Sequence, residues 1–91
     1  MIYNLDFTEP ARKDVSALKK SEPQAYKKLE KLLVELQEHP TTGTGRPEKL
    51  KYNYSGKWSR KISERHRLIY EIHEEVVTVI VLSAFGHYED K

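Results

Sequence analysis

"SGKWSRKISERHRLIY", residues 55–70, predicts a β-hairpin, because two runs rich in aromatic and β-branched residues flank the turn signal SERH. Five of these residues are lysine or arginine. Strand alternation predicts that Lys61 and Arg67 lie near each other across the turn, on one face. Two facing cations repel each other unless an acid neutralises one or an anion lies between them. A phosphate would satisfy both.

The region around this hairpin is far more basic than the chain as a whole. The net charge of the protein is +2, but the stretch from Arg46 to Arg67 carries +6 and the remainder −4. Tyr52, Tyr54 and Trp58 lie among these cations, and RNA-binding surfaces commonly combine positive charge with aromatic stacking. An RNA-binding face and a merely solvated charged surface both fit this pattern. Core packing is the better explanation for Trp58.

The first half of the chain predicts one strand and two helices. Residues 2–7 alternate as a strand with one buried face, and Thr8 is positioned to cap a helix over residues 9–19. Ser21 and Gln24 resemble a capping box that starts a second helix, which ends near residue 38. Gly, Pro and Thr then make residues 39–48 a loop. Four further strands are predicted at residues 49–54, 57–63, 67–73 and 76–85.

These elements predict one α+β domain over residues 1–91, with the order β-α-α-β-β-β-β and an antiparallel sheet that has two helices packed on one face. The chain is 37% hydrophobic and 33% charged, which indicates a small core and a charged surface. The absence of cysteine excludes disulfides and thiolate zinc sites. No secretory signal or membrane-spanning run is found, so we expect a cytoplasmic protein without a membrane partner.

Four histidines are the main candidates for acid-base chemistry. The pattern favours structural or solvent roles for His39, His66 and His73, which fall at a helix end, in a turn and at a strand end. His87 differs because it follows Gly86 at the end of the last strand, where a side chain can reach over the edge of the sheet. The position by itself favours a frayed chain end. Glu48 is one of the two acids in the basic stretch, and an ordinary salt bridge is the alternative interpretation of it.

The sequence "GTGRPEKLKYNYSGKWSRKISERHRLIYEI", followed by "GHY", resembles the YoeB/Txe branch of the RelE/ParE toxin superfamily. That branch has a Gly-x-Gly-x-Pro-Glu-x-Leu loop, then Ser-Gly-x-Trp-Ser-Arg, His-Arg-Leu-x-Tyr and a terminal His-Tyr, and all four elements occur here in order. The resemblance spans essentially the whole chain. It implies a fold like that of small microbial ribonucleases.

The resemblance further implies a toxin of a type II toxin-antitoxin system that cleaves messenger RNA in the A site of the 70S ribosome without a cofactor or metal ion. It implies a YefM/Phd-type antitoxin as partner, with operator DNA contacted only through the toxin-antitoxin complex. Relatives are often homodimers, so a homodimer and a monomer both remain open.

The same motifs imply residue roles. Glu48 corresponds to the general base, Arg67 to the arginine that stabilises the phosphate, and His87 to the general acid, with Tyr88 beside it. Supporting basic residues for RNA or phosphate are Lys49, Lys51, Arg60, Lys61 and Arg65. Lys61 stands where relatives more often carry arginine, which removes a planar, bidentate donor.

Two alternatives of other classes remain. One branch of the same fold targets DNA gyrase and is not a nuclease, but it lacks the set of Glu48, Arg67 and His87. A non-catalytic RNA-binding module would keep the basic hairpin and the aromatics. It would have no use for a glutamate and a histidine at one phosphate.

Overall fold

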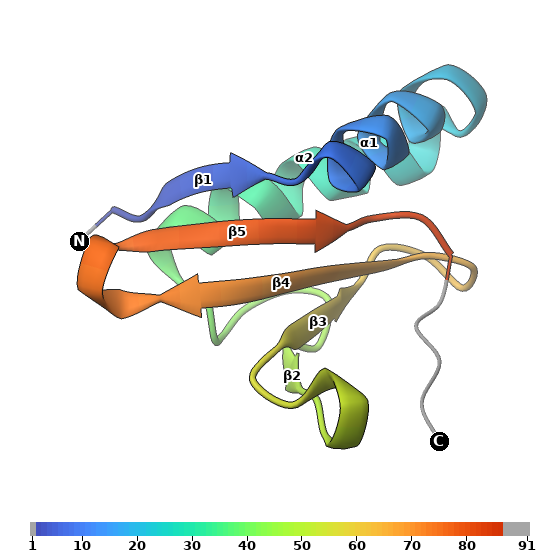
Figure 1. The fold of residues 1–91 in the computed structure, drawn as a ribbon. Helices are drawn as coiled ribbons and strands as arrows, with labels where there is room; N and C mark the ends of the chain where they lie inside the picture. The colour runs from blue at the N-terminus through green and yellow to red at the C-terminus, as the bar shows by residue number, and fades with distance from the viewer. Residues whose placement is uncertain (1, 87–91) are drawn as a thin grey trace.

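The computed structural model describes residues 2–86, which form two helices, five strands and two short 3-10 turns (Figure 1). In chain order the elements are β1 (Asn4–Phe7), α1 (Glu9–Ser21), α2 (Pro23–Glu38), β2 (Glu48–Lys49), η1 (Tyr52–Tyr54), β3 (Trp58–Lys61), β4 (Arg67–His73), η2 (Glu74–Val76) and β5 (Thr78–Ser83).

The strands form one sheet in the order β1-β5-β4-β3-β2. The predicted α+β class and element order are confirmed, but the sheet is mixed rather than antiparallel, because β1 pairs in parallel with β5. β2 to β5 form the expected antiparallel meander. The helical hairpin of α1 and α2 carries the chain from β1 to the opposite edge of the sheet. The meander then returns strand by strand from β2 to β5, so that β5 lies beside β1 and runs parallel to it.

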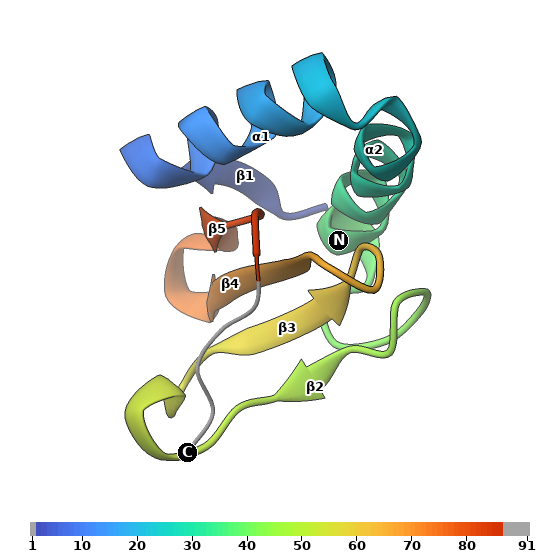
Figure 2. The same ribbon diagram turned by 90° about the vertical axis from the view of Figure 1, so that its right-hand side faces the viewer.

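Both helices lie on one side of the sheet, and β2 forms the edge farthest from α1 (Figure 2). Their apolar faces bury four leucines against side chains of β4 and β5. The largest fully buried apolar members of this core are Leu18, Leu29, Leu32, Leu36, Leu68, Tyr70, Val79 and Val81. Since successive side chains of a strand point to opposite faces, the residues between these core positions lie on the other side of the sheet.

The helix starts differ from each other. The hydroxyl of Thr8 accepts from the backbone N–H of Ala11 at 3.2 Å, which confirms the predicted cap of α1. The predicted capping box at Ser21 is wrong, because α1 extends through that residue and its hydroxyl donates to the carbonyl of Ala17. Glu22 precedes α2 instead and makes no side-chain cap there. Its carboxylate is thereby available for a distant contact.

The predicted strand over residues 49–54 is wrong beyond its first residue. The chain leaves β2 after Lys49 and turns through η1, where Tyr52 has a φ of 58°. The N–H of Leu50 donates to the carbonyl of Lys57 at 2.9 Å, which closes the turn. Aromatic residues raised the strand propensity of this segment, but the tight return to β3 determines its structure.

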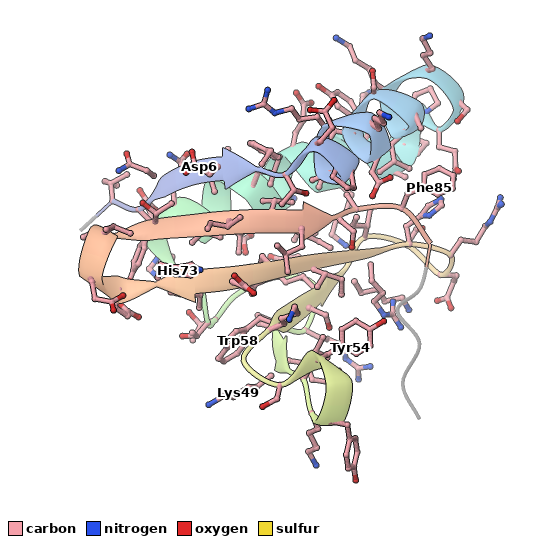
Figure 3. All side chains as sticks on the ribbon, in the orientation of Figure 1. Asp6, Lys49, Tyr54, Trp58, His73 and Phe85 are labelled. Atoms are coloured by element: carbon pink, nitrogen blue, oxygen red, sulfur yellow. The ribbon has the colours of Figure 1, made fainter. Side chains whose placement is uncertain are left out.

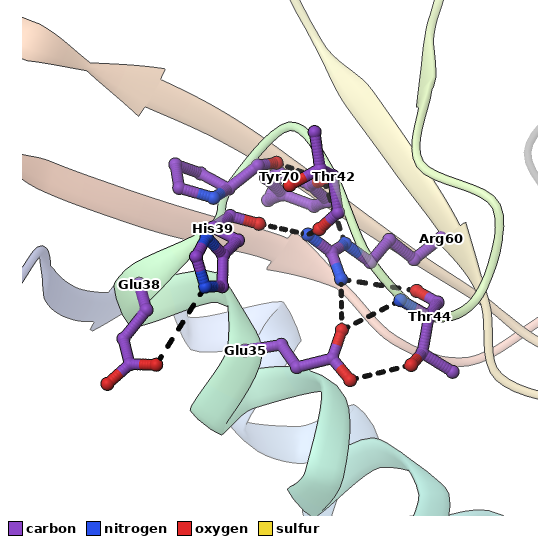
Figure 4. Close-up of polar contacts among 8 residues, drawn as sticks. Glu35, Glu38, His39, Thr42, Thr44, Arg60 and Tyr70 are labelled. Carbon is purple, nitrogen blue, oxygen red and sulfur yellow. Dashed lines mark hydrogen bonds and ion pairs between the residues drawn. The ribbon is translucent and has the colours of Figure 1, made fainter.

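Arg60 is the largest fully buried side chain among residues 2–86. Its guanidinium donates to the Glu35 carboxylate at 2.9 Å and to the Tyr70 hydroxyl at 3.2 Å. It also donates to three carbonyls of the loop that follows α2, those of His39, Thr42 and Thr44 (Figure 4). All these acceptors are protein groups, so the predicted role of Arg60 in binding RNA or phosphate is wrong. Arg60 instead fixes the loop to the sheet.

Tyr70 and Glu35 complete this buried cluster. The Tyr70 hydroxyl donates to the carbonyl of Pro40 at 2.7 Å, and burial raises the pKa of the phenol although Arg60 opposes that shift. The hydroxyl of Thr44 donates to Glu35 at 2.6 Å. This bond, with the backbone N–H of Thr44 and with Arg60, lowers the pKa of the Glu35 carboxyl against the opposing effect of its desolvation.

Neither helix within residues 2–86 has the length and apolar character needed to cross a bilayer.

Candidate active site

A polar pocket with a volume of about 100 Å³ lies where β2, β3 and β4 meet the end of the loop after α2. It is lined by Gly45, Arg46, Glu48, Ser59, Lys61 and Arg67. The space suffices for several water molecules or one phosphate-sized anion. One acid and three cations share this small volume, and all lie on the side of β3 opposite to Arg60.

Strand pairing explains why these residues converge. Glu48 lies directly opposite Ser59 in the β2–β3 pair, and Lys61 lies opposite Arg67 in the β3–β4 pair. Ser59 and Lys61 are two residues apart on β3, so they share a face. The register therefore brings an acid from one neighbouring strand and an arginine from the other to the same side of β3.

The two predicted phosphate-binding cations face each other, as the sequence predicted. Lys61 forms an ion pair with Glu64 at 2.7 Å, and the Glu64 side chain is 90% exposed. An ion pair with such an exposed partner contributes little stability. The guanidinium of Arg67 makes a long contact, 3.5 Å, with the carbonyl of Ser63. Both cations therefore keep hydrogen-bonding capacity for an anion in the pocket.

The loop wall of the pocket is held by backbone contacts. The N–H of Lys61 donates to the carbonyl of Gly45 at 2.7 Å. Gly45 has a φ of 85° and Arg46 a φ of 53°, so the chain turns sharply before Glu48. Arg60 fixes the preceding part of this loop from inside the core. The position of the acid thus depends on a buried network that does not itself line the pocket.

Arg46 and Ser59 line the pocket but were not predicted as site residues. Arg46 entered the sequence analysis only as part of the local charge. Ser59 is 2% exposed and lies between Glu48 and Lys61 in the pocket wall. Strand alternation was the available signal, because it places Ser59 on the same face as Lys61.

The remaining predicted basic residues are exposed and do not line the pocket. Lys49 pairs with Trp58, and Figure 3 shows the two side chains extending to the same side. Lys51 precedes η1, and Arg65 lies in the turn between β3 and β4. Because Lys49 alternates with Glu48 on β2, it lies on the opposite face of the sheet from the pocket.

The predicted acid His87 and its neighbour Tyr88 lie outside the described residues. Gly86, which precedes them, accepts a hydrogen bond at 2.9 Å from the N–H of Arg67. Gly86, the last described residue, therefore lies beside the backbone that carries the pocket arginine. Among residues 2–86, no group of three histidine, aspartate or glutamate side chains is arranged to hold a metal ion.

Known proteins match both the sequence and the fold. The model of a family described as YoeB-like toxin of bacterial type II toxin-antitoxin system matches residues 7–88. Toxin YoeB of Escherichia coli is 32% identical over 84 residues, which is 92% of this chain and 98% of that protein.

Solved structures agree. A YoeB/ParE toxin from Agrobacterium tumefaciens superposes with a TM-score of 0.88 at 27% identity, covering 93% of this chain and 99% of that one. The YoeB dimer from Staphylococcus aureus has a TM-score of 0.84 at 30% identity, covering 97% and 100%. A YoeB-YefM complex from the same organism gives 0.81 at 30% identity, with the same coverage. This chain belongs to the YoeB-like toxins of bacterial type II toxin-antitoxin systems.

Proposed function

We propose that this toxin is a ribosome-dependent endoribonuclease that cleaves messenger RNA in the A site and thereby inhibits translation. The observation that carries the proposal is the convergence of Glu48, Lys61 and Arg67 on one pocket of phosphate size. A glutamate beside two cations can remove a proton next to a phosphate and stabilise the negative charge that develops there.

The reaction uses only protein groups. The Glu48 carboxylate takes the proton of a ribose 2'-hydroxyl, and the oxygen forms a bond to the adjacent phosphorus. Arg67, assisted by Lys61, stabilises the negative charge that develops on the phosphoryl oxygens. The bond from phosphorus to the 5'-oxygen breaks, and His87 donates a proton to that oxygen. The products are a 2',3'-cyclic phosphate and a 5'-hydroxyl end, and DNA is inert because it lacks the 2'-hydroxyl.

The other sequence-based assignments support substrate binding. Lys49, Lys51 and Arg65 are exposed outside the pocket and are assigned to contacts with the RNA backbone, and Tyr88 lies next to the acid in sequence. Action on ribosomes places the toxin in the cytoplasm. Because the affinity contributed by phosphate contacts falls as salt rises, ribosome binding should weaken with ionic strength.

A YefM/Phd-type antitoxin is the proposed regulatory partner. The Staphylococcus aureus relative is described in complex with YefM, and also as a dimer, so both assemblies are proposed for this chain. A disordered antitoxin segment that folds on binding can cover a large surface. Contacts of the complex with operator DNA are assigned to the antitoxin.

Toeprinting on purified ribosomes with a defined message tests the activity. Wild type should cut in the A site and leave a 2',3'-cyclic phosphate. Glu48→Gln and His87→Gln should each slow cleavage by about 10²- to 10⁴-fold while the circular dichroism spectrum stays unchanged.

Cleavage by both variants at the wild-type rate would refute the assignment. A bound toxin with an intact message would indicate an RNA-binding module instead. If the ribosome is not bound, inhibition of gyrase supercoiling is the next assay.

A further inference from the structure

A buried histidine lies outside the pocket, in the turn that joins β3 to β4. His66 is 1% exposed, and both of its ring nitrogens have partners. Nε2 lies 2.8 Å from a carboxylate oxygen of Glu22, the residue between α1 and α2. Nδ1 accepts a hydrogen bond of 2.8 Å from the backbone N–H of Gly86. One imidazole therefore connects the helical hairpin to the residue that precedes His87.

These contacts determine which nitrogen carries the hydrogen. The N–H of Gly86 can only donate, so Nδ1 has to be unprotonated to accept from it. We assign the hydrogen of the neutral ring to Nε2, from which it donates to Glu22. The Glu22 carboxylate thus selects the tautomer that can hold Gly86.

Residues 84–86 make three more contacts. The N–H of Ala84 donates to the Asp14 carboxylate of α1 at 2.9 Å. The Phe85 ring packs on the His66 ring with a centroid separation of 4.4 Å. The carbonyl of Gly86 accepts from the N–H of Arg67. Gly86 is thus held on one side by the imidazole of residue 66 and on the other by the backbone of residue 67.

We propose that Glu22 and His66 are positioning residues: they fix Gly86, which directly precedes the proposed acid His87 in the sequence, beside the backbone of Arg67. The proposal rests on the proposed function. A displacement of about 1 Å in a reacting group can cost about 10²-fold in rate. Loss of the hydrogen bond between Gly86 and His66 should therefore lower the cleavage rate, even though neither Glu22 nor His66 lines the pocket.

Two substitutions of His66 separate its two contacts. His66→Asn keeps an oxygen near the position of Nδ1, which can accept from Gly86, but it does not reach Glu22. His66→Gln keeps a donor near Nε2 for Glu22 but removes the acceptor for Gly86. We expect His66→Gln to lower kcat by at least about 10-fold with little change in KM for programmed ribosomes, and His66→Asn to recover most of that loss.

His73→Gln is the matched control. This histidine lies at the other end of β4, contacts Glu71 at 3.0 Å and does not line the pocket. The His73→Gln variant should therefore cleave at the wild-type rate. Equal losses in His66→Gln and His66→Asn would overturn the proposal, because a purely structural role would not distinguish the two contacts.

A double-mutant cycle tests whether His66 acts through His87. If it does, His66→Gln should cause little further loss in the His87→Gln background. A full multiplicative loss in that background would overturn the proposal, since it would show that His66 acts independently of the acid.

Nitrogen-15 NMR separates failure of this inference from failure of the proposed function. If wild type does not cleave at all, the nuclease assignment fails. The anchor, meaning the hold of His66 on Gly86, is tested separately by the NMR spectrum of the His66 ring and by hydrogen exchange of the Gly86 amide. A hydrogen on Nε2, and faster Gly86 exchange in His66→Gln than in His66→Asn, support the anchor. A hydrogen on Nδ1, or equal exchange in the two variants, overturns it.

Discussion

Lys61 and Arg67 lie directly opposite each other across β3 and β4, on the wall of the same pocket. Two like charges in this register destabilise the strand pair, and the exposed Glu64 offsets the repulsion only in part. An anion between the two side chains would remove the repulsion. The pocket is therefore expected to gain stability when a phosphate binds.

Inorganic phosphate should raise the Tm of the wild-type toxin. At ten times its dissociation constant, a bound ligand stabilises the folded state by about 1.4 kcal/mol, which is several degrees for a chain of this size. Lys61→Gln should show a smaller rise, measured against chloride at equal ionic strength. Lys57→Gln is the control, because Lys57 pairs with Glu71 outside the pocket. The same rise in the Lys61 variant as in wild type would contradict the expectation.

Arg67→Lys should lower the rate of cleavage by about 10²-fold while leaving the Tm nearly unchanged. Lysine keeps the charge but loses the planar pair of donors that matches a phosphate. Single-turnover cleavage on ribosomes measures the effect. Arg12→Lys on α1 carries the same chemical change away from the pocket and should cleave normally. A wild-type rate for Arg67→Lys would show that a single positive charge suffices.

Arg60→Leu should destabilise the fold by about 3 kcal/mol or more. It removes the partner of Glu35 and leaves loop carbonyls without their buried donor. Urea unfolding gives the free energy. Arg65→Leu, the same change at an exposed position, should stay within about 0.5 kcal/mol of wild type. Equal effects would mean that the buried network contributes nothing.

The Glu35 carboxyl should contribute to stability in a pH-dependent way. Its pKa in the folded state lies below the ordinary value of 4.5, so the unfolded chain binds a proton more readily. The contribution is thus fully present above that ordinary value and is lost as the pH falls through the folded pKa. Glu35→Gln should be less stable than wild type at pH 7, and the gap should narrow in acid.

The measurement for Glu35 is urea unfolding at pH 7 and at several values below 4.5. Glu30→Gln, on the exposed side of α2, serves as the control for the loss of one negative charge. A gap between Glu35→Gln and wild type that does not change with pH would rule out the linkage.

Gly45→Ala should destabilise the toxin more than Gly56→Ala. Both glycines have a φ near 86°, where alanine costs about 1 to 2 kcal/mol. A Cβ on Gly45 would also lie 3.0 Å from the carbonyl oxygen of Lys61, whereas one on Gly56 meets nothing within 4 Å. Thermal unfolding compares the two, and the added cost at Gly45 should be about 1 kcal/mol or more. Equal Tm values for the two variants would show that the loop around Gly45 shifts to accept a methyl group without cost.

Local patterns predicted the parts of the structure that depend on alternation and on capping. The facing of Lys61 and Arg67 follows from the period of two in the hairpin, and Thr8 caps α1 because its hydroxyl precedes the first turn. Glu48 was assigned from the family motif, and the strand register then explains its place in the pocket. These features depend on neighbours in sequence or on one strand pair.

Features that depend on tertiary packing were not predicted. Arg60 looks like the other basic residues of its strand, and only the return of the loop after α2 surrounds it with acceptors. The parallel pairing of β1 with β5 depends on where the helical hairpin leaves the chain, which no local pattern records. His66 was predicted to have a structural or a solvent role, and its contacts were not predicted because its partners Glu22 and Gly86 are distant in sequence.

The pairing of β1 with β5 has a consequence for synthesis of the toxin. The Thr8 hydroxyl at the end of β1 donates to the carbonyl of Leu82, 74 positions later in the chain. Contacts of such long sequence separation form late in folding. On a translating ribosome β1 has no strand partner until β5 has been made. The sheet of a nascent chain thus stays incomplete until its last strand has emerged from the ribosome.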